Sequence, residues 1–218
     1  MKKFVCSVCG YVYEGEAAPE VCPICKAPAS KFVEQSDEKT WAAEHVVGVA
    51  ADVPEDIKAD LDRENIPYDK NISVGVMIET PAASEIADLL AKEADFFSIG
   101  TNDLTQYTMA VDRGNSKVAY LYSVYNPAVI RSIKRIISAA ANENIIAGMC
   151  GEAAADPLLT PLLISFGLKE FSVNASSILR TRAQIAKWTK AEADKVADEV
   201  MKCATQEEVY EILKRYQR

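Results

Sequence analysis

Residues 73–99, SVGVMIETPAASEIADLLAKEADFFSI, decide the fold class of this chain. They contain two short apolar runs, at 73–79 and 95–99, on either side of a segment at 82–92 whose apolar residues recur at helical spacing. A strand, a helix and a second strand in this order predict a βαβ unit. Its two strands lie parallel because the helix crosses over the sheet between them.

The same alternation continues on both sides of this segment. Further strands are predicted at 145–149 and 170–173. Further helices are predicted at 54–65, 127–144, 157–166 and 176–187, with one or two more in 190–216. Four apolar strands alternating with helices predict an α/β fold with a parallel sheet over residues 55–218.

Residues 1–35 differ from the rest of the chain, because they are rich in Cys, Gly, Pro and aromatic residues. Two Cys-x-x-Cys pairs, Cys6 with Cys9 and Cys22 with Cys25, stand twelve residues apart. Each pair presents two thiolates from a tight turn, and two facing pairs supply a tetrahedral site that suits zinc or iron. The spacing predicts a small metal-binding domain and leaves the metal open, and residues 36–54 form a connector.

Composition narrows the class of partner. The chain has 218 residues and a net charge of −8, so it lacks the surplus of Lys and Arg that nucleic-acid binding needs. No apolar run reaches the roughly 18 residues that span a membrane, and the N-terminus MKKFVCSVCG has no apolar segment of a signal peptide. We therefore expect a cytoplasmic protein, in which clustered cysteines bind metal more often than they form disulfides.

Polar side chains gather where the predicted strands end. Glu79 and Asp103 are expected at the ends of neighbouring strands, where two carboxylates suit Mg²⁺, although helix capping or solvation would explain them as well. Cys150 follows the strand at 145–149, and its ordinary alternative is an inert buried thiol.

A second group of residues suits an anion. Gly100, Thr101 and Asn102 predict a flexible turn whose amides can approach a phosphate. Arg113 offers a guanidinium that binds such a group in a bidentate manner, or else forms a surface ion pair with Asp112 or another carboxylate.

The N-terminal segments CGYVYEG (9–15) and CPICKAP (22–28) resemble the rubredoxin domain of the rubrerythrin family. The similarity extends through WAAEHVVGVA (41–50) and implies an iron ion held by Cys6, Cys9, Cys22 and Cys25, a one-electron carrier with a redox protein partner. A rubrerythrin also needs Glu-x-x-His pairs for its di-iron bundle. The chain has one histidine, His45, and no such pair, so it cannot form the di-iron site of a rubrerythrin peroxidase.

Residues 72–180 resemble a different family, the PEP-utilising enzymes, and most closely the phosphoenolpyruvate-binding barrel of enzyme I of the bacterial sugar phosphotransferase system. The similarity lies in residues 73–115 and in AGMCGEAAADPLLTPLLISFGLKEFSVNASSILRTR (147–182). It implies that Glu79 and Asp103 bind Mg²⁺ and that Arg113 grips phosphate near Gly100, Thr101 and Asn102. It also implies that Cys150 is the proton donor to the enolate carbon.

The resemblance begins at the helix before the fifth strand of the family's eight-stranded barrel. We therefore expect a half TIM barrel, (βα)4, without the family's phosphohistidine. Its open edges predict a homodimer that closes one eight-stranded barrel or packs edge to edge.

Three functions remain open. The first is a redox-linked binding or regulatory protein for a small anion such as phosphoenolpyruvate or pyruvate. The second is an enzyme fragment that needs a phosphohistidine partner. The third is an electron-transfer protein whose half barrel is a scaffold.

Overall fold

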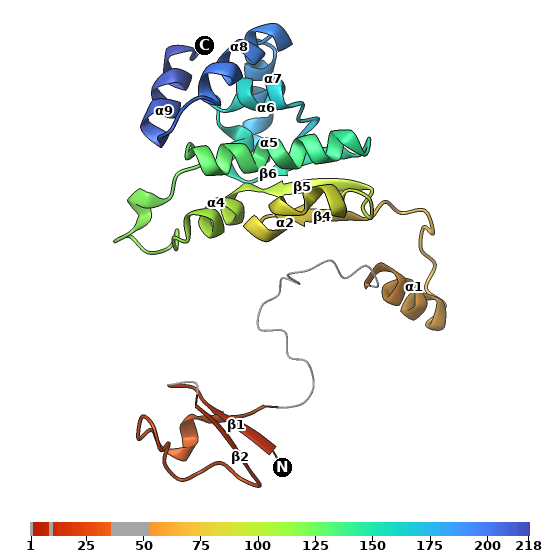
Figure 1. Ribbon diagram of the computed structural model, residues 1–218. Helices are drawn as coiled ribbons and strands as arrows, with labels where there is room; N and C mark the ends of the chain where they lie inside the picture. The colour runs from red at the N-terminus through yellow and green to blue at the C-terminus, as the bar shows by residue number, and fades with distance from the viewer. Residues whose placement is uncertain (1, 9–10, 36–52) are drawn as a thin grey trace. The chain divides into compact units, whose positions relative to one another are not determined.

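The computed structural model describes residues 2–8, 11–35 and 53–218, and the chain divides into two compact units, residues 1–48 and 49–218 (Figure 1). Each unit is described here by itself. Cys9 and most of the predicted connector, with His45, lie outside the described residues.

The N-terminal unit is a three-stranded antiparallel sheet of order β2-β1-β3. Strand β1 (Lys2–Cys6) pairs with β2 (Val12–Gly15) on one side and with β3 (Phe32–Gln35) on the other, and a short 3-10 turn, Ala29–Lys31, leads into β3. Its buried apolar side chains among the described residues are Phe4, Cys6 and Cys22. Two of these three are cysteines, so the unit has little apolar core besides its thiols.

The second unit is built on a four-stranded parallel sheet of order β4-β5-β6-β7. The strands are β4 (Gly75–Ile78), β5 (Phe96–Gly100), β6 (Ile146–Cys150) and β7 (Glu170–Phe171). Strand order equals chain order, as in one half of a (βα)8 barrel. The predicted half barrel of parallel strands, with a small separate N-terminal domain, is confirmed.

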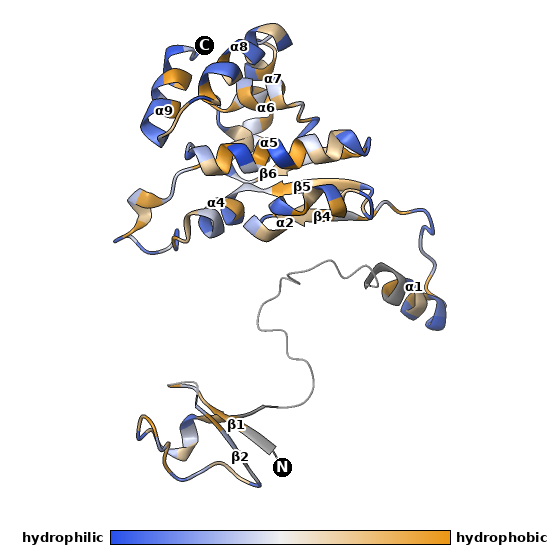
Figure 2. Cartoon of the chain, in the orientation of Figure 1, coloured by the Kyte–Doolittle hydropathy of each residue, from blue (hydrophilic) through white to orange (hydrophobic). Residues whose placement is uncertain are grey.

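The helices of this unit follow the predicted alternation, except that α4 lies where no helix is predicted. They are α1 (Val53–Arg63), α2 (Pro81–Glu85), α3 (Ala87–Leu90), α4 (Thr101–Met109), α5 (Pro127–Asn142), α6 (Thr160–Phe166), α7 (Ile178–Ile185), α8 (Lys190–Val200) and α9 (Gln206–Arg215). Short 3-10 turns lie at Ala119–Leu121, Glu152–Ala155 and Ala175–Ser177. Helix α5 runs along the sheet and carries the longest buried stripe, in which Ile133, Ile136 and Ile137 are fully buried (Figures 1 and 2).

The two faces of the sheet are covered unequally. Ile78, Ile99 and Met149 lie side by side in the strand register and are fully buried in the core shared with the helices. Residues one position away point to the opposite face. There Met77 is 47 % exposed, Phe96 38 % and Ile146 53 %, so the described elements leave that face open.

Helices α8 and α9 close the C-terminal end. Each begins with a capping box, in which Thr189 and Glu192, or Thr205 and Glu208, satisfy each other's backbone N–H groups. In the described ranges of the chain, no helix is both long and apolar enough to span a bilayer.

Candidate functional sites

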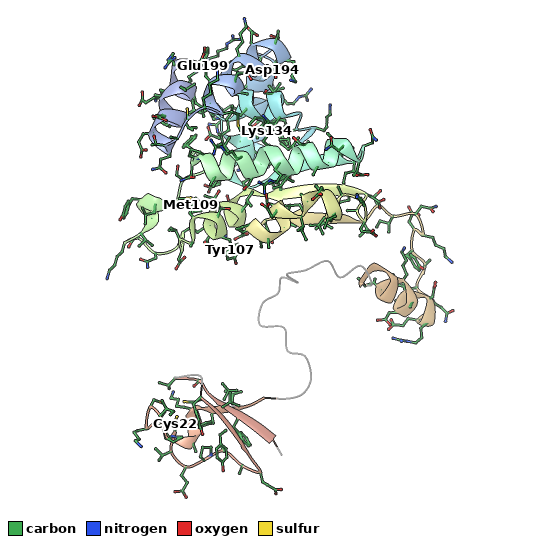
Figure 3. The ribbon with its side chains drawn as sticks, in the orientation of Figure 1. Cys22, Tyr107, Met109, Lys134, Asp194 and Glu199 are labelled. Carbon is green, nitrogen blue, oxygen red and sulfur yellow. The ribbon has the colours of Figure 1, made fainter. Side chains whose placement is uncertain are left out.

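Three cysteines of the N-terminal unit lie together. The Sγ atoms of Cys6, Cys22 and Cys25 are all within 4.8 Å of one another, and those of Cys6 and Cys25 are 3.6 Å apart (Cys22 is labelled in Figure 3). A tetrahedral ion with metal–sulfur bonds of about 2.3 Å needs thiolates about 3.8 Å apart. The three described thiols therefore fit such an ion, and Cys9, the predicted fourth ligand, lies outside the described residues.

Backbone hydrogen bonds shape the turn that carries Cys22 and Cys25. The N–H of Lys26 donates to the carbonyl of Cys22 at 3.0 Å, and the N–H of Cys22 donates to Ala27 at 2.8 Å. Lys26 completes the turn with a positive φ of 62°. The strand β1 brings Cys6 to this turn, where Cys6 and Cys22 are buried and Cys25 is half-buried.

The second cluster lies at the carboxyl edge of the half barrel, where β5 runs directly into α4. Gly100 ends β5, and Thr101, Asn102 and Asp103 form the first turn of α4. The predicted flexible turn at 100–102 is therefore wrong, as is the prediction that Asp103 ends a strand. These residues instead form a helix N-terminus, which favours anions because its N–H groups point outward.

A guanidinium lies beside this helix. Nη1 of Arg113 is 3.1 Å from Oδ1 of Asp103, and the N–H of Arg113 donates to the side chain of Gln106 at 3.2 Å. The ion pair predicted as the ordinary alternative for Arg113 is thus formed with Asp103, not with Asp112. Both side chains are partly exposed, so the pair is weak and can be exchanged for ligands.

Glu79 follows β4 and reaches the same junction. A Cβ atom added to Gly100 would lie 2.5 Å from Oε2 of Glu79 and 3.1 Å from Sδ of Met77. The Glu79 carboxylate therefore lies over the backbone that leads into Asn102 and Asp103. Carboxylate oxygens suit Mg²⁺, and the magnesium site of Glu79 and Asp103 stays a prediction.

Cys150 ends β6 on the open face of the sheet and is half-buried. Its Sγ lies 3.7 Å from Oγ of Ser98, 3.7 Å from Sδ of Met77 and 3.6 Å from the carbonyl of Ile99. Its own carbonyl accepts a hydrogen bond of 2.9 Å from the Thr101 hydroxyl, which ties β6 to α4. The thiol thus lies where the ends of β4, β5 and β6 meet the start of α4.

Sequence reasoning missed Tyr122, which lies in the loop after α4. Its hydroxyl donates to the carbonyl of Asn102 at 3.1 Å. Burial raises the pKa of Tyr122, and the nearby Arg113 guanidinium opposes that rise. Tyr122 therefore stays a neutral donor that steadies the start of α4.

Sequence reasoning also missed a pocket of about 450 Å³ beside Asn102. Its polar lining side chains include Asn102, Glu152, Asp156, Asn174, Ser177 and Arg180. The side-chain oxygen of Asn102 accepts the N–H of Glu152 at 3.3 Å, so its amide nitrogen is the donor left to face a ligand. Arg180, on α7, is the positively charged residue among the described residues that line the pocket, and no sequence motif pointed to it.

Two family models match the chain. The model of the PEP-utilising enzyme, PEP-binding domain, matches residues 44–190, and that of the rubrerythrin, rubredoxin-like domain, matches residues 4–33. The chain belongs to the PEP-utilising enzymes. Both resemblances predicted from the sequence are thus confirmed.

Several curated relatives are similar to part of this chain. Phosphoenolpyruvate-protein phosphotransferase of Geobacillus stearothermophilus is 52% identical over 158 residues, which are 72% of this chain and 27% of that protein. Those of Enterococcus faecalis (50% identity; 74% of this chain, 28% of theirs) and Listeria monocytogenes (48%; 77% and 29%) are similar to a like extent. The PEP-utilising chain described here therefore spans under a third of the length of these relatives.

Proposed function

We propose that the half barrel binds phosphoenolpyruvate, pyruvate or a similar small anion together with Mg²⁺, and that the N-terminal unit holds a redox-active iron. In this proposal the chain is a redox-linked binding or regulatory protein. The observation that carries it is the convergence of Asn102, Asp103 and Arg113 beside Glu79 at one strand-to-helix junction. That junction offers cationic, amide and carboxylate groups within one site, as a magnesium-bound phosphate and carboxylate require.

The Asp103–Arg113 pair supports a joint site for metal and anion. In the described structure each charge neutralises the other across 3.1 Å. Mg²⁺ at Asp103 and an anion at Arg113 would replace this contact together. The metal and the anion are therefore expected to strengthen each other's binding.

The test is isothermal titration of the iron-loaded full chain with phosphoenolpyruvate and Mg²⁺, in the oxidised and in the reduced state. Arg113→Ala should weaken binding about 10- to 100-fold, because it removes charge-assisted hydrogen bonds. Arg215→Ala is the matched control and should leave binding unchanged, since Arg215 on α9 pairs with Glu199 on α8 at 3.4 Å, outside the site.

Each outcome separates the functions. Saturable binding whose affinity changes with the iron's oxidation state supports the redox-linked protein. Saturable binding without that change leaves two independent units. No saturable binding in either state contradicts the proposal and leaves the half barrel as a scaffold for an electron carrier.

A second candidate is turnover, and the accessible thiol of Cys150 on the open face favours it. In this candidate the phosphoryl group passes to a histidine of a partner protein, and the enolate carbon takes a proton from Cys150 to give pyruvate. Pyruvate release on adding a histidine phosphocarrier, lost in Cys150→Ala, would support it. Pyruvate release that persists in Cys150→Ala, or its absence in the unaltered chain, would contradict it.

A further inference from the structure

The open face of the β4–β7 sheet has the side-chain pattern of a barrel interior. Gly75 lies beside Phe96, and Gly148 lies between Ser98 and Glu170 in the strand register. A Cβ on Gly75 would lie 2.3 Å from the Phe96 ring, and one on Gly148 would lie 3.4 Å from Cβ of Glu170. Large side chains thus lean across glycines of the next strand, as they do when barrel strands fill their interior in layers.

This face needs a cover. Parallel sheets are found almost only with both faces covered, and here the helical core covers one. Within the described residues, β4 pairs with β5 and β7 pairs with β6, so both end strands also have an unpaired edge. Exposed edges of this kind promote association with further strands.

We propose that a second copy of this chain covers the open face, and that two copies close one eight-stranded parallel barrel. A two-fold axis along the strands keeps all eight strands parallel and places β4 of each copy beside β7 of the other. One symmetry operation thereby pairs both edges and buries both open faces, which makes the interface closed.

Helix α1 agrees with this arrangement. In a (βα)8 barrel, each helix packs on the outside over the strand before it and the strand after it. Helix α1 precedes β4 and has an exposed apolar residue, Ile57, at 54 %. In the closed barrel, β4 and the second copy's β7 would give α1 two strands to pack on.

Sedimentation of the full chain, with and without a substitution on the open face, tests the dimer. The unaltered chain should sediment as a dimer at micromolar concentration. Ile146→Lys places a charge where the barrel interior would close, and it should weaken dimerisation about 100-fold or more. The matched control is Leu89→Lys, because Leu89 is also about half exposed (54 %) but lies on α3, in the helical layer that packs against α5.

Hydrogen exchange gives a second measurement that needs no folding of a variant. Amides of Gly75–Ile78 and Glu170–Phe171 should exchange at least about tenfold more slowly in the unaltered chain at high concentration than after dilution below the dissociation constant. A strictly monomeric chain, a dimer that Ile146→Lys leaves intact, or edge amides that exchange equally fast in both conditions would overturn the proposal. Dimerisation is measured without ligand, so its failure and a failure of phosphoenolpyruvate binding are seen separately.

Discussion

Gly151, between Cys150 and Glu152, holds the carboxyl edge of the half barrel in place. Its φ of 96° with ψ near 180° suits glycine, and a Cβ there would lie 2.5 Å from Oγ1 of Thr101 and 3.1 Å from Oδ1 of Asn102. Gly151→Ala should therefore lower the free energy of unfolding by about 1–3 kcal/mol. It should also weaken phosphoenolpyruvate binding, because Asn102 must move. Chemical denaturation and titration measure the two effects.

Gly167 provides the matched control at the same scale. It has a similar φ of 93°, but a Cβ there meets no atom within 4 Å. Gly167→Ala should cost about 1–2 kcal/mol of stability from backbone strain alone and leave ligand affinity unchanged. Equal losses of affinity in both variants would mean that the junction does not depend on Gly151.

At the residue scale, the sequence predicted those residues of the candidate site that lie close together along the chain. Gly100, Asn102, Asp103 and Arg113 fall within fourteen residues, so one motif carried them all. Tyr122, from the loop after α4, and Arg180, from α7, reach the same edge from other parts of the chain, and no short pattern connects them to it.

At the scale of elements, the capping boxes of α8 and α9 allow a direct test. The Thr189 hydroxyl accepts the N–H of Glu192, and Glu192 accepts the N–H of Thr189 at 2.9 Å. Thr189→Ala should destabilise the chain by about 1 kcal/mol, because it leaves a helix donor without its cap. Thr189→Ser keeps the hydroxyl and should cost much less in the same thermal melt.

Glu192 makes part of this stability depend on pH. A hydrogen bond from Arg218, together with those from Thr189, lowers the pKa of Glu192 from 4.5 to about 2. A carboxyl whose folded pKa is depressed stabilises the fold above the unfolded pKa and loses that effect as pH falls through the folded value. The melting temperatures of the unaltered chain and Glu192→Gln should thus differ at pH 7 and converge near pH 2. A difference that persists unchanged to pH 2 would contradict this assignment.

The elements themselves were predictable where periodicity was strong, and less so where tertiary contacts decide. Strands β4–β6 and helix α5 agree with the predicted ranges within about three residues. The segment 82–92 is instead two short helices that meet at Ile86, whose ψ of 22° breaks the helix. Helix α4 was missed because it begins without a side-chain cap. Its start is held instead by two hydrogen bonds. The Thr101 hydroxyl donates to the carbonyl of Cys150, and the Thr105 hydroxyl donates to the carbonyl of Thr101 at 2.7 Å.

At the scale of the whole molecule, the two units have cores of very different size. Besides its cysteines, the described N-terminal unit buries one large apolar side chain, Phe4, whereas the half barrel buries an extended cluster. A metal ion bound by these cysteines would supply folding free energy that the core of so small a unit lacks. The cysteine pairs and the change in composition predicted two domains, but the sequence held no pattern for how they communicate.

Removal of the metal ion therefore gives a prediction for the thermal unfolding of the full chain, which calorimetry measures. The apo chain should lose the transition of residues 1–48, while the transition of residues 49–218 moves by no more than about 2 °C, because the half barrel keeps its own core. A combined loss of both transitions would show that the units fold as one.

Phosphoenolpyruvate and Mg²⁺ should raise the melting temperature of the half barrel, since a ligand stabilises the state that it binds more tightly. If iron and anion sites are coupled by 1–3 kcal/mol, a range typical of linked sites, oxidised and reduced chains should then melt at different temperatures, and without ligand they should not.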